Sequence, residues 1–138
     1  YFVHGGISKT FIEKTGISSN TLHDINTTMR ASIDRSKDEM KKTDFYTTYY
    51  RNKGLIWYRG YFYDKLPETE IDHILHKLDA KHVVVGHCSN KEIVQLYNHK
   101  IYGVDSSIKR GKYGELLLIK KNNYQRRTIE GKQKKFSE

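Results

Sequence analysis

The sequence has almost no cysteine and almost no proline. Its 138 residues include one of each, Cys88 and Pro67. A single cysteine excludes a disulfide within the chain and gives no cysteine-rich zinc pattern, while it leaves the redox compartment open. A glycine-rich phosphate loop and a strand–turn nucleophile motif are also lacking. No apolar run approaches the roughly 20 residues that a membrane-spanning helix needs.

The composition that is present is typical of one globular domain with a strong positive charge. Hydrophobic residues make up 36% of the chain and aromatic residues 12%, including eleven tyrosines. The net charge of +9 favours anionic partners. Much of the excess lies near one turn and in the last residues (Lys109, Arg110, Lys112, Arg126, Arg127, Lys132, Lys134 and Lys135). Such a charged end is usually solvated, and a nucleic-acid patch is the alternative.

The first half of the chain predicts a short strand and two helices. Residues 1–3 have the pattern of a buried strand, and because natural domains seldom begin inside one, we expect truncation, processing or a missing partner half. Residues 8–19 resemble a linker. A helix then begins near residue 20, with four apolar residues at near-helical spacing (Leu22, Ile25, Met29 and Ile33). A Ser-x-x-Glu capping box at residue 36 predicts a second helix to about residue 50.

The second half predicts one helix followed by strands. Pro67 opens a helix to about residue 79, with four residues forming its buried stripe (Ile71, Ile74, Leu75 and Leu78). Residues 81–85 form a buried strand, and three further strands are expected (101–104, 115–119 and 124–129). This order predicts a mixed α/β domain. We assign residues 1–130 to the domain and residues 131–138 to a basic, polar tail.

Two histidines follow short hydrophobic strands directly. FVHGG at residues 2–6 contains His4, and VVGH at residues 84–87 contains His87. Glycine beside each histidine permits a sharp turn and a close approach of another group. Imidazole is a common ligand of divalent metals. If the fold brings the strand ends together, His4 and His87 can share one metal ion; otherwise each is a hydrogen-bonded structural residue.

Arg59 is the candidate for binding an anion. It lies in the aromatic run LIWYRG at residues 55–60. A guanidinium offers a flat, permanently charged fork that suits a phosphate. Trp57 and Tyr58 can hold it in place by packing or stacking. The alternative is a surface arginine beside an aromatic cluster that covers the core.

The remaining candidates have simpler structural explanations. His73 and His76 lie one turn apart on a helix, a spacing that is common on exposed faces. Cys88 can be a soft ligand, but we expect a small residue that fills a tight turn. Asp105, in the run YGVDSS at residues 102–107, can orient a ligand or simply form a turn, and a turn is expected.

Taken together, the runs FVHGG, LIWYRG and VVGH resemble the C-terminal half of the calcineurin-like metallophosphoesterases. The best match is to the bacterial Shewanella-like branch of the phosphoprotein-phosphatase group, and YGVDSS is a weaker match. The resemblance implies the C-terminal half of a four-layer α-β-β-α sandwich with mixed sheets. It also implies that His4 and His87 ligate one of two divalent metals (Mn, Zn or Fe), and that Arg59 binds the substrate phosphate. Such a metal pair neutralises phosphate oxygens and supplies a nucleophile near neutral pH.

Three motifs of that family do not occur in this sequence: Gly-Asp-x-His, Gly-Asp-x-x-Asp-Arg-Gly and Gly-Asn-His-Glu. In the family they supply the bridging aspartate, the other ligands and the general-acid histidine. We therefore expect this chain to bind metal weakly or not at all, and to be inactive by itself. A parent enzyme would hydrolyse phosphotyrosine or a small phosphomonoester.

The first strand should leave an unpaired edge, so a second copy or a complementary N-terminal half is an expected partner. The alternative function is a non-catalytic basic module that binds nucleic acid or another anionic partner. Bacterial cytoplasm and export both stay open, because any export signal would precede Tyr1.

Overall fold

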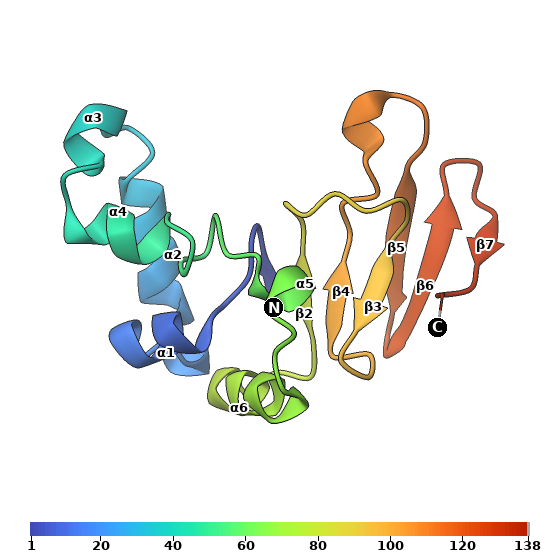
Figure 1. The fold of residues 1–138 in the computed structure, drawn as a ribbon, viewed down its shortest axis with the longest axis horizontal. Helices are drawn as coiled ribbons and strands as arrows, with labels where there is room; N and C mark the ends of the chain where they lie inside the picture. Colours follow the sequence, from blue (N-terminus) through green and yellow to red (C-terminus); the bar gives the residue numbers. More distant parts are fainter. Residues whose placement is uncertain (138) are drawn as a thin grey trace.

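A computed structural model describes residues 1–137 and shows a mixed α/β fold, with helices at one end, a mixed sheet in the middle and a second sheet at the other end (Figure 1). The helices are α1 (Lys9–Thr15), α2 (Leu22–Ala31), α3 (Lys37–Met40), α4 (Asp44–Tyr49), α5 (Gly60–Tyr63) and α6 (Glu68–Leu78). The strands are β1 (Phe2–Val3), β2 (Val83–Val85), β3 (Val94–Leu96), β4 (Ile101–Gly103), β5 (Glu115–Lys120), β6 (Asn123–Thr128) and β7 (Gln133–Lys134). The fold class predicted from the sequence is confirmed.

The central sheet has the strand order β1-β2-β4-β3. Its first three strands are parallel, and β3 runs antiparallel to β4. Phe2 pairs with Val84 and Val3 pairs with Val85. Parallel strands in register end at the same edge of a sheet, so the residues that follow β1 and β2 are brought side by side. β1 lies at an edge of this sheet, as expected.

The core lies between the central sheet and the helices α1 and α6. The apolar stripe predicted for α6 is buried, and β2 is buried on both faces. Phe11 of α1 and Ile101 of β4 belong to the same cluster. Each such side chain contributes roughly 1.5–3 kcal/mol when it leaves water. This core fixes the position of β2 and therefore of the residues that follow it.

Several boundaries differ from the sequence-based expectation. The supposed linker at 8–19 contains α1, which Ser8 begins by accepting a hydrogen bond from the Phe11 amide (3.0 Å) and which Gly16 ends at φ +63°. Only two apolar residues, Phe11 and Ile12, lie between these caps, so the segment shows no helical stripe. The helix expected at 36–50 is two short helices, because Thr43 starts a new one by capping the Tyr46 amide.

Three further expectations were wrong. Ile33 lies beyond the end of α2 and is 74% exposed, because the helix stops at Ala31. β1 is not buried, since Phe2 is 76% exposed at the sheet edge. β3 was not expected at all, because its sequence VQL is too short to show an alternating pattern. Within the predicted tail, β7 pairs with β6.

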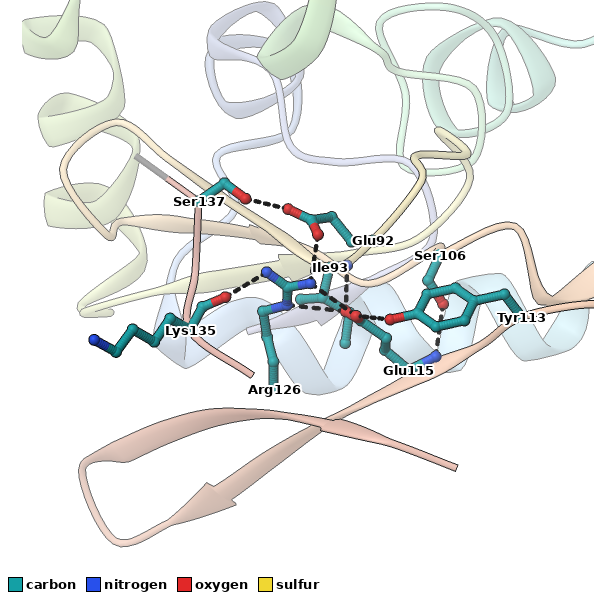
Figure 2. Close-up of polar contacts among 8 residues, drawn as sticks. All are labelled: Glu92, Ile93, Ser106, Tyr113, Glu115, Arg126, Lys135 and Ser137. Carbon is teal, nitrogen blue, oxygen red and sulfur yellow. Dashed lines mark hydrogen bonds and ion pairs between the residues drawn. The ribbon is translucent and has the colours of Figure 1, made fainter. Parts of the chain in front are cut away.

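The second sheet is joined to the rest by a buried ion cluster (Figure 2). Arg126 of β6 donates to Glu115 of β5 through Nε (2.9 Å) and Nη2 (2.7 Å), and to Glu92 through Nη2 (2.6 Å). The side chain of Glu115 is 0% exposed and that of Arg126 is 3% exposed. The Lys135 carbonyl accepts a further bond from Arg126 (2.5 Å). Every charged atom of Glu115 is therefore matched inside the protein.

We predict that Arg126→Met strongly destabilises the fold, because it leaves the Glu115 carboxylate buried without its partner. The free energy of unfolding should fall by about 3–5 kcal/mol. Glu115→Leu combined with Arg126→Met should recover much of this loss, since an apolar pair replaces the ion pair. Urea unfolding measures all three proteins. Arg110→Met, at an exposed arginine, is the matched control. If the free energy of unfolding falls equally in Arg110→Met and Arg126→Met, the prediction is wrong.

We also predict an acid-sensitive contribution from Glu115. Burial would raise the pKa of its carboxyl group, but hydrogen bonds from Arg126, Tyr113 and the Ile93 amide outweigh burial and hold the pKa below its usual range. A lowered pKa adds stability above the unfolded value of about 4.3, and this stability is lost as the pH falls below it. As the pH is lowered from 5, the urea midpoint of the native protein should therefore fall more steeply than that of Glu115→Gln. If the two midpoints fall in parallel with pH, the prediction is wrong.

Candidate functional site

The pairing of β1 with β2 brings the two predicted histidines into contact. His4 Nε2 lies 3.0 Å from His87 Nδ1, although the residues are 83 positions apart in the chain. The imidazole rings meet edge to face at 4.8 Å between centroids. The Gly86 amide also donates to the His4 carbonyl oxygen (2.9 Å), which locks the two strand ends together. The juxtaposition that the sequence left open is present in the structure.

The backbone around the pair is unusual in two places. His87 has φ +61°, a left-handed conformation that non-glycine residues seldom adopt and that occurs often at functional sites. Gly5 packs so tightly that a Cβ atom there would lie 2.5 Å from the Ile56 carbonyl oxygen. Gly86 is different, because a Cβ atom would meet only the His4 carbonyl oxygen at 3.6 Å. Only the first of the two glycines therefore provides the close approach that we expected.

The surroundings of His87 favour its neutral form. Burial lowers the pKa of its imidazole, and the positive charge of Arg59 and the neighbouring His4 lower it further. A neutral imidazole has one nitrogen free to bind a metal ion or accept a hydrogen bond. The Nε2 atom of His87 is buried and has no hydrogen-bond partner within residues 1–137. If Nε2 carries the proton, the lone pair of Nδ1 points toward His4.

Trp57 links Arg59 to this pair. The guanidinium carbon of Arg59 lies 5.5 Å from the centroid of the Trp57 ring, and Trp57 meets the His87 ring at 5.0 Å. Arg59 itself is exposed just before α5. Tyr58 does not hold the arginine, because it is 2% exposed and packs on Tyr61 in the core. Stacking on Trp57 therefore orients a free cationic fork beside the histidines.

Asp105 anchors the loop that follows His87. Its carboxylate accepts from Ser89 Oγ (2.7 Å) and from the Ser107 amide (2.9 Å), and its carbonyl oxygen accepts from the Asn90 amide (2.8 Å). The bond from the Ser107 amide is a local turn contact, which agrees with the expected turn, and the bonds from Ser89 and Asn90 are long-range contacts that hold the loop. Cys88 is buried in the tight turn, and burial raises the pKa of its thiol. Its environment is that of a small packing residue.

Glu115 is a residue of this region that the sequence analysis missed. Its Oε2 accepts from the Ile93 amide (2.8 Å), and its own amide donates to Ser106 Oγ (2.9 Å) (Figure 2). It thus ties the loop after His87 to the segment that contains Asp105. The sequence showed only that a glutamate lies in an expected strand. That its side chain points inward became visible only in the structure of β5.

The structure supplies part of a metal site. Two imidazole nitrogens 3.0 Å apart can both reach one ion at an ordinary nitrogen–metal bond length of roughly 2.1 Å. Among residues 1–137, no group of three or more histidine, cysteine or carboxylate side chains is placed to hold a metal ion. His73 and His76 are exposed on α6. The donor set therefore fits a metal ion that takes further ligands from elsewhere.

Arg126 cannot belong to a basic binding surface. It was counted in the nucleic-acid alternative, but it is buried and paired with two carboxylates. That alternative therefore loses one of its basic residues. The segments that the structure describes also contain no helix long and apolar enough to cross a membrane.

The chain is similar in structure to protein tyrosine phosphatases. Two solved structures of a cold-active protein tyrosine phosphatase, one of them described as from a psychrophilic Shewanella species, match 96% of this chain with a TM-score of 0.86 and 39% sequence identity. A curated relative, Shewanella-like protein phosphatase 1 of Plasmodium berghei, is 32% identical over 91 residues, or 62% of this chain. No family model matches the sequence.

The chain spans only part of these proteins. It covers 38% and 39% of the two solved chains and 23% of the Plasmodium relative. The name of the Plasmodium relative is that of the Shewanella-like branch, which is the branch that the motifs resemble. The likenesses concern the fold and the sequence, and the relatives' names carry no information about metals.

We predict that Gly5→Ala and Gly86→Ala differ sharply. The new methyl group at residue 5 collides with the Ile56 carbonyl and should cost about 1–3 kcal/mol of unfolding free energy. It should also move His4 away from His87, which histidine ring resonances in nuclear magnetic resonance spectra would show. Gly86→Ala meets ordinary contact distances and should change stability by less than about 0.5 kcal/mol. Equal losses in the two variants would rule out close packing at Gly5 as the cause.

Proposed function

We propose that this chain forms part of the active site of a metal-dependent phosphomonoesterase. His4 and His87 would hold one metal of a dinuclear centre, and Arg59 would bind the phosphate group of the substrate. The observation that carries the proposal is the 3.0 Å approach of two imidazole nitrogens from distant parts of the chain, with Arg59 positioned nearby through Trp57.

The chemistry of each residue suits this role. The lowered pKa of His87 keeps its imidazole available as a ligand at neutral pH. Arg59 has a planar guanidinium fork that matches two phosphate oxygens. It would stabilise the negative charge that spreads over those oxygens during hydrolysis. Divalent metals, when bound, would neutralise the phosphate and supply a nucleophile near neutral pH.

Substrates and partners follow from the same proposal. The similarity to protein tyrosine phosphatases supports a phosphorylated substrate, with phosphotyrosine or a small phosphomonoester as the favoured classes. The remaining metal ligands would come from a complementary N-terminal half, or a second copy could join at the open edge of β1. This chain by itself would then be inactive.

We predict that the full-length protein hydrolyses 4-nitrophenyl phosphate when Mn or Zn is supplied, and that Arg59→Ala lowers kcat/KM by about 100- to 1,000-fold. Arg59→Lys should restore only a small part, because an ammonium group cannot make the bidentate contact. His87→Ala should lower the bound metal content measured by elemental analysis. The exposed His76→Ala is the matched control and should leave metal content and activity unchanged. Metal-independent activity, or full activity in Arg59→Ala, would overturn the proposal.

A further inference from the structure

A pocket of about 560 Å³ opens beside Arg59. It lies among α4, the turn that follows it, and α5, and its lining is aromatic and charged (Tyr46, Arg51, Asn52, Lys53, Trp57, Arg59, Gly60, Tyr63 and Asp64). This volume falls within the range of ordinary ligand sites, which is roughly 300–1,000 Å³. The only tryptophan of the chain and two tyrosines form part of its wall.

The charges of the pocket leave one cation available. Lys53 pairs with Asp64 at 3.7 Å and also lies 5.9 Å from the Tyr58 ring. Arg59 is stacked on Trp57 and belongs to the proposed phosphate contact. Arg51 makes none of the ion pairs found among residues 1–137, and it is exposed at the pocket. An exposed guanidinium in the lining of a pocket is suited to bind one anionic group.

The pocket adjoins the candidate site. Trp57 and Arg59 line the pocket, and Trp57 also contacts His87. If the phosphate lies between Arg59 and the histidines, as in the proposed function, the neighbouring part of the substrate can lie in this pocket.

We propose that this pocket binds an anionic side chain next to the phosphorylated residue of a peptide substrate, with Arg51 as its charged contact. The inference rests on the proposed function and adds a substrate preference to it. A carboxylate and a second phosphate share the required chemistry. Both are planar or branched oxyanions that a guanidinium binds through two hydrogen bonds.

The test compares phosphotyrosine peptides that differ only at the flanking position, which is glutamate, phosphoserine or glutamine. The full-length protein should hydrolyse the two anionic peptides with a kcat/KM about two- to fivefold higher than the glutamine peptide, the size expected of one exposed charge pair. Arg51→Gln should remove this ratio, and the ratio should also shrink at high salt. Arg35→Gln, an exposed arginine outside the pocket, is the matched control and should keep the ratio.

A binding measurement separates the two proposals. Calorimetric titration with the same peptides lacking phosphate on tyrosine should show the same preference, and Arg51→Gln should again abolish it. A preference seen in binding without any hydrolysis would refute the proposed function but support the pocket. Hydrolysis without a flanking preference, or a preference that survives Arg51→Gln, would refute the pocket. A preference for phosphoserine alone would identify the anion as a second phosphate.

Discussion

The parallel pairing of β1 with β2 is the contact on which the candidate site depends. Two residue pairs join the first strand of the chain to a strand in its middle, and the amide of Gly86 closes the ladder on the carbonyl of His4. So short a pairing is weak by itself, because closing a long loop costs entropy before the contact stabilises anything. It persists because β2 is fixed from its other side by β4 and by the core under α6. The contact between the two histidines therefore depends on the packing of the core, which holds β2 in place.

A second constraint acts on the loop after His87. That loop returns to β3 with its backbone held by Asp105 and by Glu115, and Glu115 is held in turn by Arg126. A buried ion pair is weak evidence for stability in general, because desolvation offsets the attraction. Here the pair also fixes the positions of the segments that it connects. The pair connects the second sheet to the two segments that border the site, so the position of His87 depends on residues that touch no ligand.

The sequence indicated which residues lie near one another better than it predicted the elements around them. Glycine and aromatic neighbours made recognisable runs around His4, His87 and Arg59, and the structure brings His4 to His87 and links Arg59 to them through Trp57. α6 was found because four apolar residues repeat at helical spacing. In contrast, α1 carries only two buried residues, and β3 has three residues, so neither leaves a periodic signal. Glu115 and Arg126 had no local signal either, because their partnership arises from the register of β5 with β6 and from a contact with Glu92 in another part of the chain. Long-range pairing is what a single sequence does not display.

The charge around the two histidines bears on what completes the site. Burial, Arg59 and Lys109 act to lower the pKa of His87, whereas Asp105 acts to raise it. The same positive potential opposes a divalent cation and favours a phosphate. Neutral imidazoles leave the charge of a dication uncompensated, so carboxylates from another segment would favour a bound metal pair. In the proposed enzyme, metal binding and the docking of that segment would each strengthen the other, because both are favoured by the same opposite charges. A site divided in this way would gain its metals and its activity together, and the surplus positive charge left on this chain would attract the substrate.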